Sequence, residues 1–264
     1  MVKERPRQPR GAVGGIRPFG GRLVPLFATP PEPCPYLPER NERKLLTPLY
    51  GPNASALFDE LVVRGFRRSH SVAYRPACRA CDACLPVRVR VADFRPTRNL
   101  RRGLKDAADW HVEEIDPPAA LPNHYRLFQR YQSSRHGGGD MSRMSFGDYR
   151  AMVEESAVRT VLVEFRDDGG AVIGVAIYDR VVDGLSGLYQ FFEPDLEPSS
   201  PGTFMIVWLI ERARTLGLPY LYLGYYIEDC RKMAYKVRFR PLEALGPDGR
   251  WAPFDPPASA EAIK

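Results

Sequence analysis

The chain has 264 residues, 44% of them hydrophobic, which is enough to bury the core of one large domain or two modest ones, and its net charge of +6 favours an anionic partner. The N-terminus has no apolar core of signal-peptide length and no apolar run is long enough to cross a bilayer, so we expect a cytoplasmic protein with no membrane partner. Five cysteines in a reducing compartment argue against a disulfide framework.

The first part of the chain predicts an arm followed by a compact module. Residues 1–24 are basic, rich in glycine and short of large apolar groups, which is typical of a flexible basic arm. Residues 25–110 form the expected N-terminal cysteine- and arginine-rich module, in which the proline-dense segment 30–38 is extended or turn-like. Residues 53–65 predict a helix ended by a glycine, and residues 86–94 predict a half-buried strand with arginines on its open face.

The second part of the chain predicts helices, then a meander of strands. Helices are expected at 99–109, 122–134, 146–155 and 201–215, and strands at 160–165, 171–179, 184–192 and 220–224. This order predicts an α+β fold with a mixed sheet of the N-acetyltransferase (GNAT) type and flanking helices. We expect this transferase domain at residues 111–250 and a C-terminal tail at 251–264.

Three of the five cysteines, Cys78, Cys81 and Cys84, form a CxxCxxC ladder. Two residues between cysteines allow a tight turn to aim the sulfurs at one point, as in zinc and iron–sulfur sites, and the spacing does not choose between the two. Cys34 is the expected fourth ligand. The alternative is that some of these thiols are apolar packing and the ladder is an empty turn. Cys230 is far away in sequence and is expected to be a core or cleft thiol.

A basic run extends through the module as far as its last predicted helix, and only Asp82 and Asp93 interrupt it. Its main members are Arg67, Arg68, Arg75, Arg79, Arg88, Arg90, Arg95, Arg98, Arg101, Arg102 and Lys105. Tyr74 and Phe94 lie among them and are able to stack on bases. We favour contact with RNA or phosphate over the alternative, a solvated charged face.

A third cluster of chemistry-bearing residues lies at 220–241, where five tyrosines stand close to several cations. A strand that ends at Gly224 allows a ligand to approach the backbone closely. We interpret the combination of tyrosines with Lys232 and Lys236 as a binding cleft. The alternative is an aromatic core strand followed by a basic surface helix.

Several catalytic motifs are absent from the sequence. It has no GxSxG elbow, no P-loop, no HExxH and no dinucleotide fingerprint. The Q/RxxGxG/A loop by which ordinary acetyltransferases hold acetyl-CoA is also missing. An acetyltransferase-like sheet in this chain is therefore expected to work without CoA.

Five blocks of sequence, taken together, resemble a known family. They are CPYLPERNERK at 34–44, GFRRSHSVAYRPACRACDACLPVRV at 65–89, DRVVDGLSGLYQFFEPDL at 179–196, GTFMIVWLIERARTLGLPYLYLGYYI at 202–227, and RKMAYKVRFRPLE at 231–243. The chain resembles the bacterial aminoacyl-tRNA–protein transferases, relatives of the eukaryotic arginyl-tRNA–protein transferase. The leucyltransferase branch, which acts on proteins with N-terminal Asp or Glu and marks them for N-degron degradation, is the most similar.

The resemblance implies a tRNA-dependent enzyme that joins leucine from leucyl-tRNA to a protein α-amine. Because the donor ester is already activated and an α-amine has a pKa near 7.7–8.0, no serine or cysteine nucleophile is needed, which agrees with the missing triad. No cofactor is expected to be required for transfer. The resemblance also implies a zinc ion or iron–sulfur cluster at the N-terminal cysteines as a possible addition, with the ligand set Cys34, Cys78, Cys81 and Cys84.

Site residues follow from these expectations. Arg67, Arg68 and Arg75 are candidates to read the acidic side chain of the acceptor protein, because a guanidinium pairs bidentately with a carboxylate. The candidates for tRNA phosphates are Lys232, Lys236 and Arg238. The candidates for the reaction centre are Asp183, Tyr189, Tyr222 and Tyr225, with Asp183 orienting the amine or, alternatively, serving only as a hairpin turn.

Three other functions remain open from the sequence. The first is an arginyl transferase of the same fold, which a comparison of leucyl- and arginyl-tRNA donors would separate. The second is a small-molecule acetyltransferase, which the missing CoA loop disfavours. The third is a non-catalytic metal module that binds tRNA.

Overall fold

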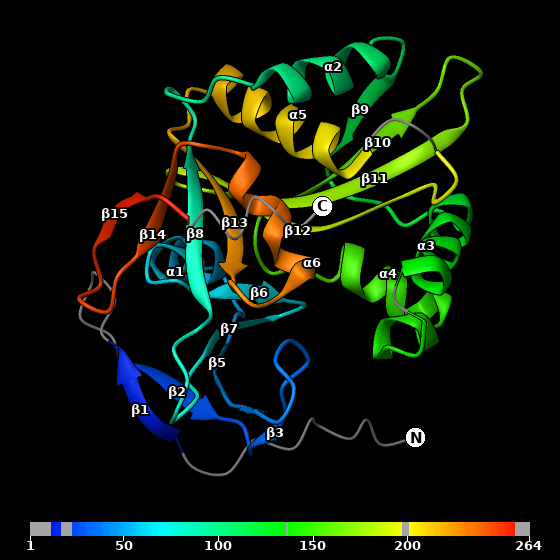
Figure 1. The fold of residues 1–264 in the computed structure, drawn as a ribbon. Helices are drawn as coiled ribbons and strands as arrows, with labels where there is room; N and C mark the ends of the chain where they lie inside the picture. The colour runs from blue at the N-terminus through cyan, green and yellow to red at the C-terminus, as the bar shows by residue number, and fades with distance from the viewer. Residues whose placement is uncertain (1–11, 17–22, 136, 197–200, 257–264) are drawn as a thin grey trace, which may run out of the picture.

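The computed structural model describes residues 12–16, 23–135, 137–196 and 201–256. It contains a large mixed sheet with helices on both faces and a smaller five-stranded sheet at one end (Figure 1). The α+β class and the mixed sheet with flanking helices that the sequence predicts are confirmed.

The large sheet has eight strands, and its centre is a meander followed by a parallel pair. In spatial order the strands are β15 (Trp251–Phe254), β14 (Leu242–Leu245), β8 (Leu85–Arg90), β13 (Tyr220–Tyr226), β12 (Gly184–Phe192), β11 (Val172–Val181), β10 (Thr160–Arg166) and β9 (His111–Ile115). β10, β11 and β12 pair antiparallel, and α5 (Pro201–Thr215) then returns the chain so that β13 lies parallel to β12. This is the GNAT-type order of meander, helix and strand that the sequence predicts.

Helices cover both faces of this sheet. α5 and α2 (Arg98–Asp106) lie on one face, where they pack with Val161 and Val163 of β10. α3 (Pro122–Arg135) and α4 (Phe146–Glu154) cover the other face and pack with Leu162. Because both faces are buried, the central strands are apolar along almost their whole length instead of alternating.

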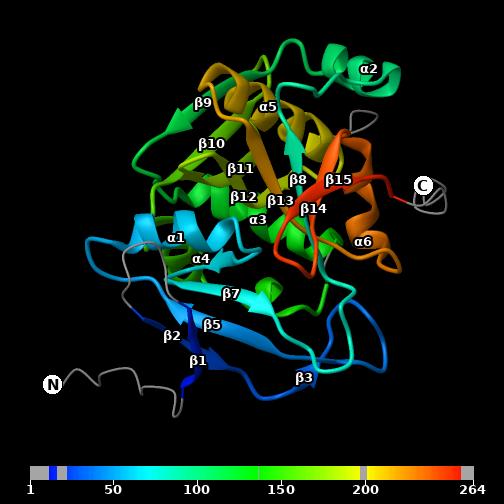
Figure 2. The ribbon, with the colours of Figure 1, turned by 90° about the vertical axis from the view of Figure 1, so that its left-hand side faces the viewer.

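The smaller sheet lies below the large sheet in the view of Figure 2. Its spatial order is β1 (Ala12–Ile16), β2 (Val24–Ala28), β5 (Lys44–Pro48), β7 (Val72–Pro76) and β6 (Arg67–Ser69). α1 (Ala54–Val62) packs between the two sheets, and its Phe58 and Leu61 meet Phe66, Val181 and Tyr222 in one apolar cluster. A short hairpin of β3 (Glu32–Pro33) and β4 (Asn41–Glu42) precedes β5.

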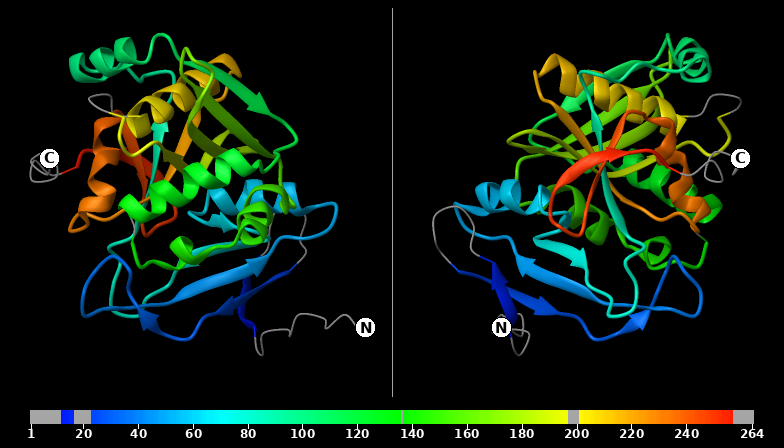
Figure 3. Two further views of the ribbon diagram at one scale, coloured as in Figure 1. Left: turned by 90° about the vertical axis from the view of Figure 1, so that its right-hand side faces the viewer. Right: turned by 60° about the vertical axis from the view of Figure 1, so that its left-hand side comes forward.

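The remaining elements are short. They are the 3₁₀ turn η1 (Asp140–Arg143), the helix α6 (Arg231–Ala234) and the 3₁₀ turn η2 (Tyr235–Arg238). Two views in Figure 3 show α6 close to the edge of the large sheet and the five-stranded sheet at the opposite end from α2. Within the described ranges, none of the helices has both the length and the apolar character that a membrane crossing needs.

Most of the elements lie where the sequence predicts them, but the sheets cross the expected domain limits. β8 belongs by sequence to the module 25–110, yet it is inserted between β13 and β14 of the large sheet. β15 lies in the expected tail 251–264, and residues 12–16 of the expected arm 1–24 form a strand paired with β2. Strand pairing joins segments far apart in sequence, and local composition does not report it.

Candidate active site

The parallel strands β12 and β13 separate after a short paired stretch. They pair only from Gly184 and Tyr220 to Ser186 and Tyr222. Both strands then run on, β12 to Phe192 and β13 to Tyr226. We call residues 187–192 of β12 and 223–226 of β13 the strand fork, because their facing edges make no ladder with each other.

Arg67 of β6 lies at the base of the strand fork. Its Nη1 donates to Ser186 Oγ at 3.0 Å, and its Nη2 donates a short hydrogen bond to the carbonyl oxygen of Gly187. These two bonds hold a half-buried guanidinium at the point where the strands separate. The side chain of Arg67, the predicted acceptor-reading residue, thus reaches from the smaller sheet to β12 of the large sheet and contacts Ser186, 119 residues away in sequence.

Gly224 makes room for this arginine. Its φ of +79° lies in the left-handed region that glycine adopts easily, at a register irregularity between β13 and β8. A Cβ at this position would lie 3.0 Å from Arg67 Nε. The glycine predicted from the sequence to allow a close approach thus admits a side chain of the module.

Tyr189 projects from the β12 side of the strand fork and meets α3. Gln132 Nε2 donates to its hydroxyl oxygen at 2.6 Å, and Gln132 Oε1 is buried without a partner in the described part of the chain. Burial raises the pKa of Tyr189, so its hydroxyl stays protonated. Since that oxygen accepts from Gln132, its own proton is available to a ligand.

Sequence reasoning missed Gln132 and Ser186. Gln132 follows Phe128 by four residues and so lies on the apolar side of α3. A polar residue at this position of the helix indicates a buried polar contact. Ser186 carries no comparable signal, because it alternates with apolar residues in the same way as a surface serine would.

Tyr225 lies at the far side of the strand fork, but its hydroxyl is already engaged. It donates to the carbonyl oxygens of Gly65 at 2.8 Å and Tyr74 at 3.3 Å, and burial raises its pKa. The hydroxyl ties β13 to the N-terminal module. Tyr225 therefore helps to build the site through its position, and its proton has a fixed internal acceptor.

Asp183 and Tyr222 lie at the paired end of β12 and β13, apart from the strand fork. Tyr222 donates to Asp183 Oδ2 at 2.9 Å and accepts from Arg88 Nη1 at 3.1 Å. Asp183 is in the turn between β11 and β12, as its alternative interpretation predicts. The four candidates for the reaction centre are thus divided, with Tyr189 and Tyr225 beside the strand fork and these two residues in a separate network.

Arg88 is the centre of that network, and its burial corrects the prediction that it lies on an open strand face. Its side chain is 8% exposed, and its Nε donates to Glu243 at 2.8 Å. The guanidinium carbon lies 3.4 Å from the ring centroid of Tyr220 and 4.4 Å from that of Trp251. The face expected to be solvent is covered by side chains of the neighbouring strands, among them Tyr220 and Trp251, which the local alternation does not reveal.

Arg68 is buried and Arg75 is half-buried, and the contacts of both lie away from the strand fork. Arg68 is 3% exposed and makes a bidentate pair with Asp179, at 2.8 and 2.7 Å, that links the module to β11. Arg75 donates to the carbonyl oxygen of Arg64 and lies over the ring of Phe66. Of the three arginines predicted to bind the acceptor, Arg67 alone reaches the strand fork.

Lys236 corrects the prediction that it contacts tRNA phosphate. It is 4% exposed, its Nζ donates a short hydrogen bond to the carbonyl oxygen of Tyr225, and Met233 Sδ is 3.3 Å away. Burial, and then the positive charge of Arg67, lower the pKa of Lys236 to about 7. Lys232 and Arg238, the other predicted phosphate ligands, are exposed on α6 and η2.

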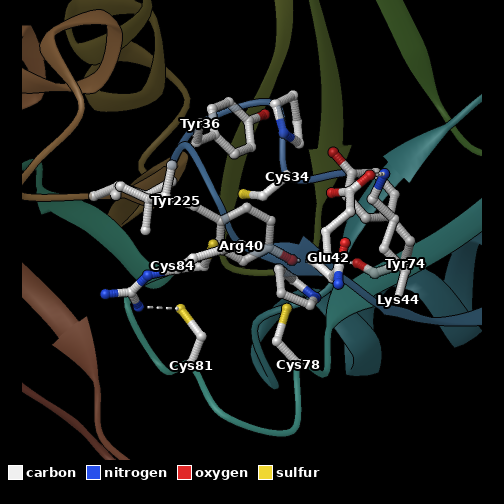
Figure 4. A pocket seen from close by; sticks show the side chains of 15 residues that line it. Cys34, Tyr36, Arg40, Glu42, Lys44, Tyr74, Cys78, Cys81, Cys84 and Tyr225 are labelled. Atoms are coloured by element: carbon white, nitrogen blue, oxygen red, sulfur yellow. Dashed lines mark hydrogen bonds and ion pairs between the residues drawn. The ribbon is translucent and has the colours of Figure 1, made fainter. Parts of the chain in front are cut away.

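The four N-terminal cysteines line one cavity of about 80 Å³, together with Tyr36, Tyr74 and Tyr225 (Figure 4). Cys81 Sγ accepts from Arg40 Nη1 at 3.1 Å. Burial raises the pKa of Cys84 to about 12, with the neighbouring thiols adding to the effect. The predicted convergence of Cys34 with the ladder is therefore present, and Cys230 is buried in the adjacent apolar cluster.

These thiols do not form an assembled metal centre. Among the described residues, no group of three or more His, Cys, Asp or Glu side chains is arranged to hold a metal ion. All five cysteines are free. The donor types fit zinc or an iron–sulfur cluster, while their arrangement is that of a cavity wall.

Comparison with known proteins assigns the chain to a family. A sequence model described as "Arginine-tRNA-protein transferase, N terminus" matches residues 32–102, and one described as "Arginine-tRNA-protein transferase, C terminus" matches residues 123–246. Proteins named aspartate/glutamate leucyltransferase are similar over 87% of this chain. The one from Paramagnetospirillum magneticum is 51% identical and is covered over 95% of its length, and that from Gluconacetobacter diazotrophicus is 48% identical and covered over 88%.

Solved structures are similar at a greater distance. The structure of L-PGS from Bacillus licheniformis aligns over 79% of this chain and 65% of its own, with a TM-score of 0.46 and 10% identity, which is too remote to bear on function. The two matching sequence models and the similar relatives are sufficient by themselves to assign the family. The chain belongs to the arginine-tRNA-protein transferase family and is a transferase that uses aminoacyl-tRNA.

Proposed function

We propose that this protein transfers leucine from leucyl-tRNA to the α-amine of proteins that begin with Asp or Glu, and so marks them for degradation in the cytoplasm. The name aspartate/glutamate leucyltransferase, carried by relatives about half identical to this chain, supports the donor and the acceptor. The observation that carries the proposal is the strand fork with one arginine, Arg67, at its base.

The strand fork suits the aminoacyl end of the donor. Its facing backbone edges offer N–H and C=O groups to an extended ligand, as unpaired strand edges do. Tyr189 adds a protonated hydroxyl beside them. A donor held there would have its ester carbonyl next to fixed hydrogen-bond donors, which stabilise the oxyanion of acyl transfer.

The chemistry needs few groups from the protein. The neutral α-amine attacks the ester carbonyl carbon, and a C–N bond forms while the carbonyl oxygen becomes an oxyanion near Tyr189. The oxyanion collapses, the C–O bond to the tRNA ribose breaks, and the ribose hydroxyl leaves with a proton that the amine has given up. Because a useful fraction of α-amines is neutral at cellular pH, positioning supplies much of the rate.

Arg67 is the residue that we assign to the acidic side chain of the acceptor. A guanidinium has five N–H donors, and two of its nitrogens bond Ser186 and Gly187, so donors remain for a carboxylate. A carboxylate bound there would place the adjacent α-amine at the base of the strand fork. This geometry would favour Asp and Glu over residues without an acidic side chain.

The donor and the acceptor are tested together by transfer of labelled leucine from leucyl-tRNA to a peptide that begins with Asp. A peptide that begins with Ala and a parallel reaction with arginyl-tRNA complete the set. Leucine on the Asp peptide alone supports the proposal. Arginine on that peptide would instead favour the arginyl transferase that the family's description suggests, and transfer from neither donor would refute both.

The role of Arg67 is tested by the variant Arg67→Gln, with Arg75→Gln as the matched control from the same sheet. We expect Arg67→Gln to lower kcat/KM for the Asp peptide by about a hundredfold, since a hydrogen bond to a charged group and the positioning of the amine are both lost. Arg75→Gln should transfer leucine normally, because its partners are internal to the module. Equal rates for the two variants would contradict the assignment.

A zinc ion or an iron–sulfur cluster on Cys34, Cys78, Cys81 and Cys84 remains a proposal that rests on the donor types. Such a group would clip the cysteine ladder to the segment around Cys34, and no step of the transfer passes through it. Metal and sulfide analysis of protein purified without oxygen tests the proposal. A stoichiometric metal that disappears in Cys81→Ser supports it, and metal-free protein with full thermal stability refutes it.

A further inference from the structure

The basic run from Arg67 to Lys105 is divided by the fold into an internal part and an external part. Arg67, Arg68, Arg75 and Arg88 all have partners inside the protein. In the part that follows β8, Arg90 pairs with Asp93, and Arg95 donates to backbone carbonyls. Apart from the exposed Arg79 between Cys78 and Cys81, the described cations of the run that lack an internal partner begin at α2.

α2 exposes four cations on the surface of the molecule. Its nine residues, RNLRRGLKD, include Arg98, Arg101, Arg102 and Lys105, and all four side chains are exposed. Within the described ranges, none of the four makes an ion pair or a side-chain hydrogen bond. Their spacing of three, four and seven residues places them along one side of the helix, over about 10 Å. Leu100, on the opposite side, is buried in the core.

Few acids neutralise this surface. The exposed carboxylates of Asp93 and Glu211 are engaged by Arg90 and Arg214. Asp106 ends the helix by sequence, and Asp109 is exposed just after it. Four cations against these two acids leave a positive field along α2, which is the electrostatic footprint of a polyanion-binding surface.

The position of α2 connects it to the strand fork. α2 packs on α5, and Trp110, four residues beyond α2, lies edge-on against Phe204 in the first turn of α5 at 4.8 Å. That turn reaches the strand fork, because Gln190 Nε2 donates to the carbonyl oxygen of Gly202 at 3.2 Å. α2 and α5 thus form one helical layer on the large sheet. The cations lie on α2, and the first turn of α5 borders the proposed donor site.

A second basic segment lies on the same face of the large sheet. Phe239, next to the exposed Arg238 of η2, packs in the same apolar cluster as Leu100 and α5. Figure 1 shows α5 between α2 and α6, where the exposed Lys232 lies. Cations therefore stand on both sides of α5, on one face of the large sheet.

We propose that the exposed face of α2, formed by Arg98, Arg101, Arg102 and Lys105, is a docking surface for the phosphate backbone of the donor tRNA beyond its 3′ end. The proposal rests on the proposed function, because that function supplies the polyanionic partner. A tRNA extends far beyond the few nucleotides that the strand fork can hold, so its paired stem must lie on other parts of the protein. Point charges on a rigid helix bind such a backbone without reading its sequence.

The test compares two triple variants of the full chain that remove the same charge. Arg98→Gln/Arg101→Gln/Lys105→Gln changes α2, and Arg126→Gln/Arg150→Gln/Arg250→Gln changes three exposed arginines elsewhere. Binding of uncharged tRNA is measured at several salt concentrations. For the α2 variant we expect the slope of log K against log salt to fall in magnitude by about 2 and the Kd to rise roughly tenfold, whereas the control variant keeps the wild-type slope.

Transfer assays separate this proposal from the proposed function. At saturating leucyl-tRNA the α2 variant should reach the wild-type kcat, with a raised KM for the tRNA alone, and its Tm should be unchanged. An identical salt slope for the two variants would overturn the docking proposal even if leucine transfer is normal. Conversely, weakened tRNA binding by the α2 variant alone, in a protein that transfers no leucine, would leave the docking surface standing and refute the donor assignment.

Discussion

The two ends of β13 use similar residue types for opposite purposes. At the paired end, Arg88 lies between the rings of Tyr220 and Trp251, and its nitrogens bond Glu243 and Tyr222, so every charge there has a partner. At the forked end, Arg67 binds one hydroxyl and one carbonyl and keeps spare donors, and the Tyr189 hydroxyl keeps its proton. A closed network, in which every polar group has an internal partner, stabilises the fold. A network with spare hydrogen-bond donors can bind a ligand, and the number of spare donors therefore distinguishes the two ends.

The largest loss of stability is expected when Arg88 is removed. Arg88→Met should lower the free energy of unfolding by about 3–5 kcal/mol, because it leaves Glu243 buried without its partner. Denaturant unfolding measures the loss. The double variant Arg88→Met/Glu243→Leu should recover most of it, and a double variant as unstable as the single one would contradict the assignment of the paired end as a closed network.

At the forked end, Tyr189→Phe should act on turnover rather than on stability. We expect kcat to fall by about 10²–10³, the usual effect of losing one oxyanion donor. The control is Tyr226→Phe in β13, whose buried hydroxyl has no partner among the described residues and should be dispensable. Single-turnover leucine transfer measures both, and a normal rate for Tyr189→Phe would remove that hydroxyl from the mechanism.

Gly224→Ala tests whether the close approach of Arg67 matters. The new methyl group would contact Arg67, and an alanine at this position would have to adopt a positive φ. We therefore expect the free energy of unfolding to fall by about 1–3 kcal/mol and kcat/KM to fall by about a hundredfold. Gly217→Ala has a similar φ of +69° with open space around it. It should share the loss of stability and keep its activity, and a parallel loss of activity would show that strain alone is responsible.

Lys236 should give the stability of the fold a pH dependence. Its pKa in the folded state is about 7, below the usual 10.4 of the unfolded chain, so between these values the unfolded state binds more protons. Stability should therefore rise from pH 7.5 to 9.5, by at most about 1.4 kcal/mol per pH unit. In Lys236→Met this rise should be absent, and an unchanged slope of unfolding free energy against pH would show that the ammonium remains charged in the fold.

The prediction of the fold from the sequence succeeded where the signal is local. The meander β10 to β12 and the helix α5 were recognisable because apolar runs, hairpin turns and a helix-ending Gly217 lie within a few residues of one another. The insertion of β8 into the large sheet was not, because its two partner strands lie more than a hundred residues further along the chain. The limits predicted from composition for the transferase domain therefore leave out β8 and β15 of the large sheet.

The prediction of the site was less complete for the same reason. Arg67 and Arg68 are adjacent and equivalent in sequence, yet alternation along β6 sends one to the strand fork and the other into a buried pair with Asp179. The position of the cysteines was easier to predict, because their spacing indicates that the sulfurs point to one place, and all four line one cavity. Lys236 looked like a surface cation because a single buried lysine leaves no pattern in a basic segment.

The family, the order of helices and strands, and the residue types available for chemistry can all be predicted from the amino-acid sequence, because they depend on local patterns and on long matching blocks. The tertiary structure decided which cations are neutralised, which remain open, and where β12 and β13 part. The physical reason is that the cost of burying a charge depends on partners brought together only by folding, as Arg68 and Asp179 are across 111 residues.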